Sequence, residues 1–379
     1  MISRNCKRVV SLLLVFIFAF SVSVFAYADD GTEDNVAYEN EEDIPVLHND
    51  PDDFVLDDNW KPYDPDLFEN DMPTRDETWV KKGGLKTVSN GGNDWRTQGF
   101  AVGTGYCYSI DCKEDETAHK LYRKNMNNNS DAELMTQSGS VDSLRTANDM
   151  TLATNTESNG TVHRYLYVIA ALKNSTDNSY IIKLEYDGLN YWQVARYNLS
   201  AHFNGIAKVK YYTNILGTQM IQFLLRKGSA FYTVAVQRAQ KGTHYLYATH
   251  RFNISVPEDY TNYKLEGIHY DSGKLYGAFY GYYNNDYTTA KLNVIIVYNG
   301  VDNAISSLIV NSLSSNTTVP ITASTSTIGL FEIEGIGFPV NNPNLDCDRL
   351  WFTTNERSGP YPLVPRIDGG IYADTQDIR

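Results

Sequence analysis

The chain has 379 residues, a formal net charge of −14, and 42% hydrophobic and 13% aromatic residues, with 28 tyrosines among them. This length and apolar fraction are sufficient for a sizeable buried core. The acidic balance speaks against nucleic acid as a partner, because phosphate binding depends on stripes of Lys and Arg.

The N-terminus has the pattern of a secretory signal peptide. A basic start is followed by an apolar run over residues 9–25 and by Ala26-Tyr27-Ala28, whose small residues suit cleavage. The run is short for a membrane-spanning helix, and no later segment is apolar enough to cross a bilayer. We therefore expect residues 1–28 to be removed and the protein to be secreted and extracellular, with no membrane span.

Negative charge is concentrated directly after this segment. Residues 29–77 contain nineteen Asp and Glu against Lys61 and Arg75, so their net charge is about −17, whereas residues 78–379 are close to neutral. Few apolar residues and strong self-repulsion predict a disordered acidic linker over 29–77. The folded domain is then expected over 78–379.

The cysteines do not form a disulfide framework. Beyond Cys6 in the leader, the chain has Cys107, Cys112 and Cys347, an odd number. Cys107 and Cys112 are close enough in sequence to pair across a hairpin, but a lone C-x4-C is weak evidence for zinc. We expect three structural thiols and leave the pairing of Cys107 with Cys112 open.

Residues 78–379 have the pattern of an all-β domain. Short apolar runs, rich in Tyr, Val, Ile and Thr and bounded by Gly, Asn, Asp and Ser, indicate strands separated by turns. Examples are "RYLYVIAAL", "SYIIKLEY", "MIQFLLRKG", "AFYTVAV" and "LNVIIVY". No long stretch has a sustained helical period.

A polar-Gly-apolar motif, called the recurring phrase below, is found five times, with Asp in place of Gly in one copy. The copies are Gln98-Gly99-Phe100, Asn148-Asp149-Met150, Asn204-Gly205-Ile206, Glu266-Gly267-Ile268 and Glu334-Gly335-Ile336. They are 50, 56, 62 and 68 residues apart, and an aromatic or aliphatic strand follows each. Units of this length, holding about four short strands, are typical of propeller blades.

We therefore expect a five-bladed β-propeller over residues 78–379. The C-terminal "DGGIYADT" is predicted as a strand of the last blade, and "ETWVKKGG" near residue 80 as its outer strand, which would close the ring. A pair of two-sheet sandwiches is the main competing fold.

The recurring phrase also supplies the candidate site. At the start of each inner strand, its polar side chains would converge at one mouth of the axis, its Gly would let backbones approach, and its apolar residue would pack between blades. The candidate ligand-binding residues are Gln98, Asn148, Asp149, Asn204, Glu266, His269 and Glu334. Such a ring can bind sugar hydroxyls, an axial Ca²⁺ or only ordered water. No cofactor is required.

Glycoside hydrolysis is the alternative, because that reaction uses two carboxyl groups beside the scissile bond. Asp149, Glu266 and Glu334 would then supply a base, a pKa-setting partner and an acid. Five-bladed glycosidases of the arabinanase and xylosidase type gather three carboxylates at the axis, but usually place an Asp on the first blade, where this chain has Gln98. A role without catalysis is therefore favoured.

The stretches "TQGFAVGTGYCYSI", "TANDMTLAT" and "FEIEGIGF" resemble the secreted bacterial propellers of the helveticin J-like type. The resemblance covers most of 95–372 and implies an extracellular five-bladed propeller that acts on or binds the bacterial envelope. We expect a monomeric module that binds carbohydrate or cell-envelope polymer. A bacteriocin-like interaction protein is a further alternative. Tyrosines of "YGYYNNDY" would offer rings for stacking on sugars.

Overall fold

The computed structural model describes residues 79–85, 95–113, 115–172, 175–282, 291–321, 330–339, 350–357 and 366–374. The chain divides into two units, Met1–His48 and Asn49–Arg379, and everything described belongs to the second. The expected signal peptide, the whole acidic linker, Cys347 and most of "YGYYNNDY" lie outside the described residues.

Strands make up most of the described chain and form successive antiparallel meanders, which are numbered here in chain order. The first contains β2 (Trp95–Val102), β3 (Tyr106–Lys113), β4 (His119–Asn125) and β5 (Glu133–Leu134). The second contains β7 (Asp149–Thr156), β8 (Val162–Ala170), β9 (Tyr180–Asp187) and β10 (Asn190–Leu199). The third contains β11 (Gly205–Thr213), β12 (Gln219–Lys227), β13 (Ala230–Gln237) and β15 (Thr249–Ser255). The fourth contains β16 (Lys264–Asp271), β17 (Lys274–Tyr282), β18 (Lys291–Tyr298) and β19 (Asn311–Ile321). The fifth contains β20 (Leu330–Gly337), β21 (Trp351–Arg357), β22 (Arg366–Asp374) and β1 (Trp79–Gly84).

The fifth meander combines the two ends of the described chain. β1 pairs antiparallel with β22, with Trp79 opposite Asp374 and Gly84 opposite Gly370. The expectation that the segment near residue 80 is the outer strand of the last sheet is confirmed.

Short strands tie neighbouring meanders together. β14 (Gly242–Leu246), which follows β13 in the chain, pairs in parallel with β10 of the second meander. β6 (Thr136–Gln137) also pairs in parallel with β10, and β15 pairs in parallel with β19. Backbone hydrogen bonds therefore add to side-chain packing between these sheets.

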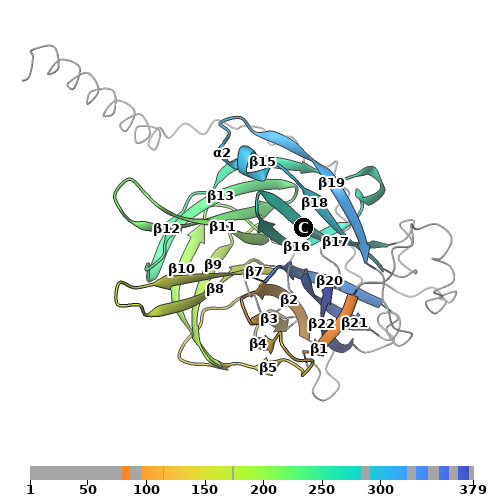
Figure 1. The fold of residues 1–379 in the computed structure, drawn as a ribbon, viewed down its shortest axis with the longest axis horizontal. Helices are drawn as coiled ribbons and strands as arrows, with labels where there is room; N and C mark the ends of the chain where they lie inside the picture. The colour runs from red at the N-terminus through yellow and green to blue at the C-terminus, as the bar shows by residue number, and fades with distance from the viewer. Residues whose placement is uncertain are drawn as a thin grey trace, which may run out of the picture. The chain divides into compact units, whose positions relative to one another are not determined.

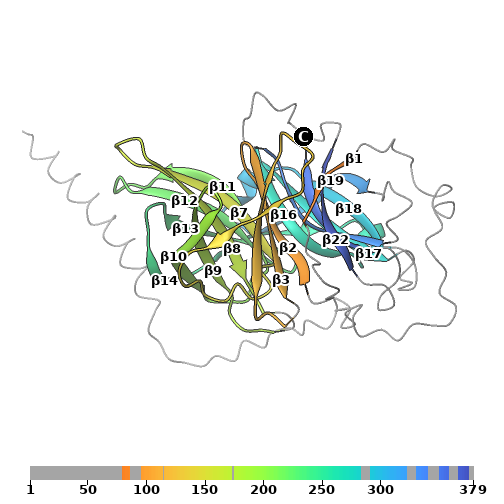
Figure 2. The same cartoon turned by 90° about the horizontal axis from the view of Figure 1, so that it is seen from below.

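The first strands of the meanders contact one another in a closed circuit. β2 contacts β7, β7 contacts β11, β11 contacts β16, β16 contacts β20, and β20 contacts β2. Figures 1 and 2 show these strands inside and the later strands of each meander further out. This is the arrangement of inner strands in a β-propeller, and a pair of sandwiches would not produce it.

The third residue of each recurring phrase is buried in a separate hydrophobic cluster of the described residues. These residues are Phe100, Met150, Ile206, Ile268 and Ile336. Each cluster joins two meanders; that of Met150, for example, includes Ile110 of β3 and Val168 of β8. The expected packing of the apolar phrase residue between sheets is confirmed.

The strand predictions quoted above are also confirmed, as β8, β9, β12, β13 and β18. Sequence patterns did not identify the short helix α2 (Val301–Ser306) or the 3-10 turn η4 (Glu258–Tyr260). Within the described chain, no helix is long and apolar enough to cross a membrane.

The pairing of Cys107 with Cys112, which the sequence left open, does not occur in the structure. Both thiols are free and buried, and both lie on β3. Residues five apart on one strand are about 16 Å apart and point to opposite faces, which a disulfide cannot bridge.

Candidate functional site

The recurring phrases lie at one level of the inner strands, where the backbones crowd together. A Cβ added to Gly335 would lie 2.5 Å from the Cβ of Phe100, and one added to Gly267 would lie 2.8 Å from the Cα of Gly335. A Cβ on Gly99 would lie 2.9 Å from the carbonyl oxygen of Ala147. Glycine is therefore needed here for close approach, as the sequence indicated.

Three of the phrases coincide with irregularities in strand pairing. The register of β2 against β3 shifts between Thr97 and Phe100, and that of β16 against β17 shifts at Glu266. The register of β20 against β21 shifts at Glu334. A bulge takes a residue out of the regular ladder and redirects its side chain, so these bulges orient Glu266 and Glu334.

The carboxylate of Asp149 connects three inner strands. Its Oδ1 accepts the backbone N–H of Met150 at 2.9 Å, and its Oδ2 accepts those of Ile206 and Ile268 at 3.2 Å each. The side chain is almost fully buried, and burial raises the pKa of Asp149 to about 8, opposed by these hydrogen bonds and by Arg226. Asp149 is thus a structural acceptor for the next two phrases.

Arg226, on β12, lies beside this carboxylate and is not part of any phrase. Its Nη2 donates to the carbonyl oxygens of Asn204 at 3.2 Å and Glu266 at 3.5 Å. Burial lowers the pKa of this guanidinium, while the charges of Glu266 and Asp149 oppose that shift. Sequence reasoning missed Arg226 because it is on a second strand, outside the phrases.

Gln98 and Glu334 form a second cluster with Asn355 of β21. The Gln98 Nε2 donates to Glu334 Oε2 at 3.4 Å, and the Asn355 amide donates to the other oxygen of Glu334. Asn355 also pairs with the backbone of Thr97, whose N–H it accepts at 2.9 Å. Asn355 therefore fixes Glu334 against β2, and the sequence did not point to it.

Glu266 and His269 lie on β16 but have different surroundings. Glu266 is buried apart from 9% of its side chain, and its Oε1 is 2.6 Å from the Nζ of Lys264, whose side chain is 65% exposed. The half-buried His269 ring packs against Phe338, with ring centroids 5.6 Å apart.

Asn148 and Asn204 differ from the carboxylates in having unused hydrogen-bonding capacity. Both residues are half-buried, and within the described part of the chain the Oδ1 of each is itself buried and has no hydrogen-bond partner. Such an oxygen gains a hydrogen bond from water or from a ligand hydroxyl.

Among the residues of the predicted ring, Asp149 and Glu266 thus lie beside Arg226, and Gln98 and Glu334 lie beside Asn355. Within the described residues there is no group of three His, Cys, Asp or Glu side chains able to hold a metal ion. An axial Ca²⁺ site therefore stays a prediction.

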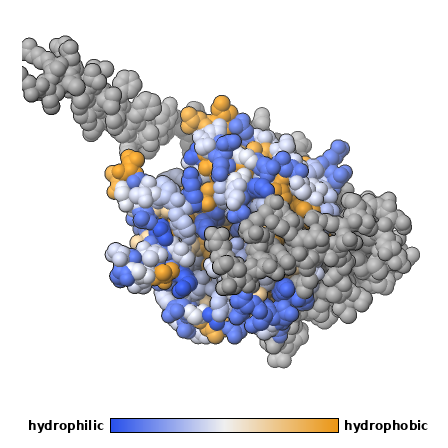
Figure 3. All heavy atoms as spheres, in the orientation of Figure 1, coloured by the Kyte–Doolittle hydropathy of each residue, from blue (hydrophilic) through white to orange (hydrophobic). Residues whose placement is uncertain are grey.

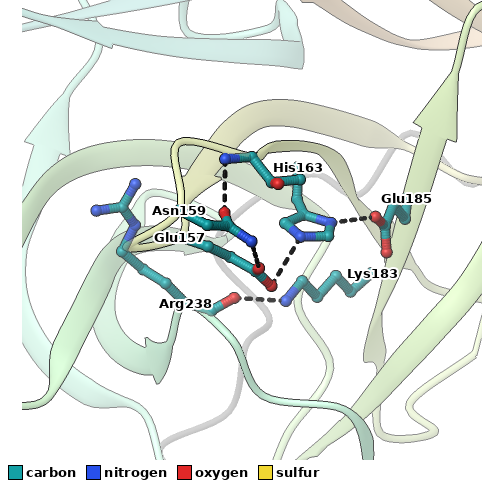
Figure 4. Close-up of polar contacts among 7 residues, drawn as sticks. Glu157, Asn159, His163, Lys183, Glu185 and Arg238 are labelled. Carbon is teal, nitrogen blue, oxygen red and sulfur yellow. Dashed lines mark hydrogen bonds and ion pairs between the residues drawn. The ribbon is translucent and has the colours of Figure 1, made fainter.

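A further polar cluster lies between the second and third meanders (Figure 4). His163 Nδ1 is 2.6 Å from Glu185 Oε1, and His163 Nε2 is 3.0 Å from Glu157 Oε1. Nearby, Lys183 donates to the carbonyl oxygen of Arg238 at 2.6 Å. Two carboxylates facing both ring nitrogens require the doubly protonated imidazolium, and the hydrogen bond to Glu185 is the main cause of the raised pKa of His163.

No protein-family model and no curated protein matches the chain. Similar solved structures include a thermostable family-43 glycoside hydrolase, which is 10% identical at a TM-score of 0.38, with 77% of this chain and 92% of that chain covered. A Staphylococcus aureus phage tail fiber is 13% identical at a TM-score of 0.41, covering 82% and 55%. An endo-arabinase from Bacteroides thetaiotaomicron is 10% identical at a TM-score of 0.40, covering 79% and 98%. The resemblance to helveticin J-like propellers is not confirmed by a family match.

Proposed function

We propose that this chain is a secreted, monomeric, five-bladed β-propeller that binds a carbohydrate or a cell-envelope polymer at the axial end where the phrases meet, without cleaving it. The circuit of inner strands and the separate hydrophobic cluster for each phrase support five blades. The secreted location rests on the signal-peptide pattern of residues 1–28.

Binding is favoured over hydrolysis because the three candidate carboxylates already have hydrogen-bond or ion-pair partners within the protein. A glycosidase needs one carboxylic acid to protonate the leaving oxygen and a second to act as base or nucleophile. Asp149 already accepts three backbone N–H groups. Glu334 is held by Asn355 and Gln98, and Glu266 by Lys264.

The amide side chains supply the ligand contacts in this proposal. The buried, unpartnered oxygens of Asn148 and Asn204 would accept sugar hydroxyls that enter beside them, and the half-buried Gln98 lies at the same level. A polyhydroxyl ligand suits this site because each hydroxyl both donates and accepts, whereas an apolar ligand would leave these oxygens unpaired.

Binding to a panel of glycans and to purified cell wall tests the proposal. We expect the Asn148→Ala/Asn204→Ala double variant to bind about tenfold more weakly or worse, with no soluble product from any sample. Asn190→Ala, an exposed residue at the start of β10, is the matched control and should bind like the wild type.

Three results would contradict this function. Products that disappear in a Glu266→Gln variant would establish a hydrolase. Equal binding by the double variant and the wild type would move the ligand away from the axis. Growth inhibition of bacteria without glycan binding would favour the bacteriocin-like alternative.

A further inference from the structure

One continuous segment of the domain contains no acidic residue. Residues 188–257, which include β10 and the whole third meander, have no Asp or Glu and eight basic residues. These are Arg196, Lys208, Lys210, Arg226, Lys227, Arg238, Lys241 and Arg251. Because residues 78–379 are close to neutral in total, positive charge is concentrated in this segment, most of it on the third meander.

The same sheet carries an exposed apolar tip. Ile215 is 101% and Leu216 is 82% exposed, in the turn between β11 and β12. Figures 1 and 2 show this hairpin projecting from the domain beside the β7–β8 hairpin, and Figure 3 shows apolar side chains on this side of the domain. Two neighbouring large aliphatic side chains that are this exposed indicate an interaction site.

The turn is held in one conformation by its own hydrogen bonds. The Oδ1 of Asn214 accepts the N–H of Leu216 at 3.0 Å and that of Thr218 at 2.9 Å. Gly217, with φ +77°, donates to the carbonyl oxygen of Asn214 at 3.0 Å. The aliphatic pair is thus presented by an ordered turn, which reduces the entropy lost on binding.

Along β11, from the tip toward the phrase, the exposed side chains are first aliphatic, then aromatic and then basic. Tyr211 and Tyr212, each 37% exposed, lie about 10 Å below the tip, and the exposed Lys210 lies about 15 Å below it. Arg238 packs its guanidinium over the Tyr211 ring at 4.5 Å. Aliphatic, then tyrosine, then cationic groups follow the order of acyl chains, interface and phosphates in a lipid leaflet.

A second apolar loop lies at the same end of the domain. Leu308, Ile309 and Val310 are 99%, 71% and 44% exposed, between α2 and β19. Helix α2 is attached to the β16–β17 turn, because Val301 N–H donates to the Gly273 carbonyl oxygen at 3.1 Å. β11 and β16 are neighbours that both begin near the phrase level, so their distal turns lie at one end.

We infer that this end of the domain binds an anionic membrane surface. Ile215 and Leu216 enter the boundary of the acyl chains, while Lys210 and its basic neighbours contact the lipid phosphates. A soluble anionic polymer would also satisfy the lysines, but it offers no hydrocarbon for the aliphatic tip. Glu157, at the neighbouring β7–β8 turn, is an acidic group of the second meander, and it is paired with His163.

Flotation of the whole chain with phosphatidylcholine vesicles, with and without phosphatidylglycerol, tests this inference. We expect preference for the anionic vesicles and about tenfold weaker partitioning of Ile215→Ser/Leu216→Ser, with a smaller loss for Lys208→Gln/Lys210→Gln. Tyr245→Ser/Tyr247→Ser is the matched control, because these rings are also exposed but Tyr245 pairs opposite Asn198, near the other end of β10.

A second readout separates the tip from the apolar run at residues 9–25, which can itself bind lipid. An environment-sensitive dye on an Ile215→Cys variant should shift to the blue with anionic vesicles, beyond any shift of the identically treated wild type. The absence of this shift would overturn the inference. So would equal flotation of the tip variant, or a preference for a soluble polyanion over vesicles. Glycan binding at the axis involves other residues, so either proposal can fail alone.

Discussion

The carboxylate of Asp149 accepts a hydrogen bond from the backbone N–H of Ile268 at 3.2 Å, although the two residues are 119 positions apart in the chain. The same oxygen accepts the N–H of Ile206, so one buried side chain connects β7 to both β11 and β16. The second phrase has Asp where the other four have Gly, and this connection explains the difference.

Replacing Asp149 by Asn should destabilise the protein strongly. Asn retains one acceptor oxygen but turns an NH₂ group toward a backbone N–H, so at least one buried donor loses its partner. We expect the free energy of unfolding, measured by chemical denaturation, to fall by about 3 kcal/mol. Asn148→Ala is the control and should cost less than about 1 kcal/mol; similar losses for both variants would argue against the role assigned to Asp149.

The stability of the wild type should depend on pH through the same group. The pKa of Asp149 is about 8 in the folded state against an ordinary value of 3.8. Between these values the folded state retains a proton that the unfolded chain releases, so the free energy of unfolding should fall as pH rises from about 4 to about 8. Denaturation curves across this range should show a shallower fall for Asp149→Asn; parallel profiles would mean that Asp149 is ionised throughout.

His163 should titrate above its ordinary pKa of 6.5, because Glu185 and Glu157 stabilise the imidazolium. Its contribution to stability is complete below that value and is lost as pH rises through the raised pKa. NMR titration of the imidazole is the direct measurement. Glu185→Gln should move the midpoint down, and an unchanged midpoint would show that the hydrogen bond to Glu185 does not set it.

Adding a methyl group at Gly335 should be costly, since its Cβ would lie 2.5 Å from the Cβ of Phe100. We expect Gly335→Ala to lower the free energy of unfolding by about 2 kcal/mol. Gly105→Ala is the matched control, because a Cβ there meets nothing within 4 Å. Equal stabilities of the two variants would show that the inner strands can move apart without cost.

Much of the fold was predictable because the recurring phrase reports local constraints. Gly335 and Gly267 lie where two backbones approach closely, and Ile206 and Ile268 lie at buried positions between sheets. Each of these constraints selects a residue type, so the sequence shows them as a motif that recurs. The parallel pairing of β14 with β10 of the second meander was not predictable, because pairing between segments that are distant in the chain leaves no comparable local pattern in the sequence.

The site was predicted less completely. The candidate residues lie at one level, but the two groups that organise them, Arg226 and Asn355, are on second strands and outside the phrases. Their partners are set by tertiary packing, which one strand's sequence does not encode. Total charge also concealed the acid-free segment 188–257, because the acidic residues elsewhere in the domain balance it.

The pairing of β1 with β22 has a consequence for how the domain is made. Trp79 is among the first domain residues to be synthesised, and its partner Asp374 is among the last. The hydrogen-bonding edge of β22 stays open until the two ends of the domain meet, and ring closure requires nearly the whole chain. The last sheet is therefore complete only after Asp374 has been synthesised, and a domain that lacks either β1 or β22 would present an unpaired strand to its neighbours.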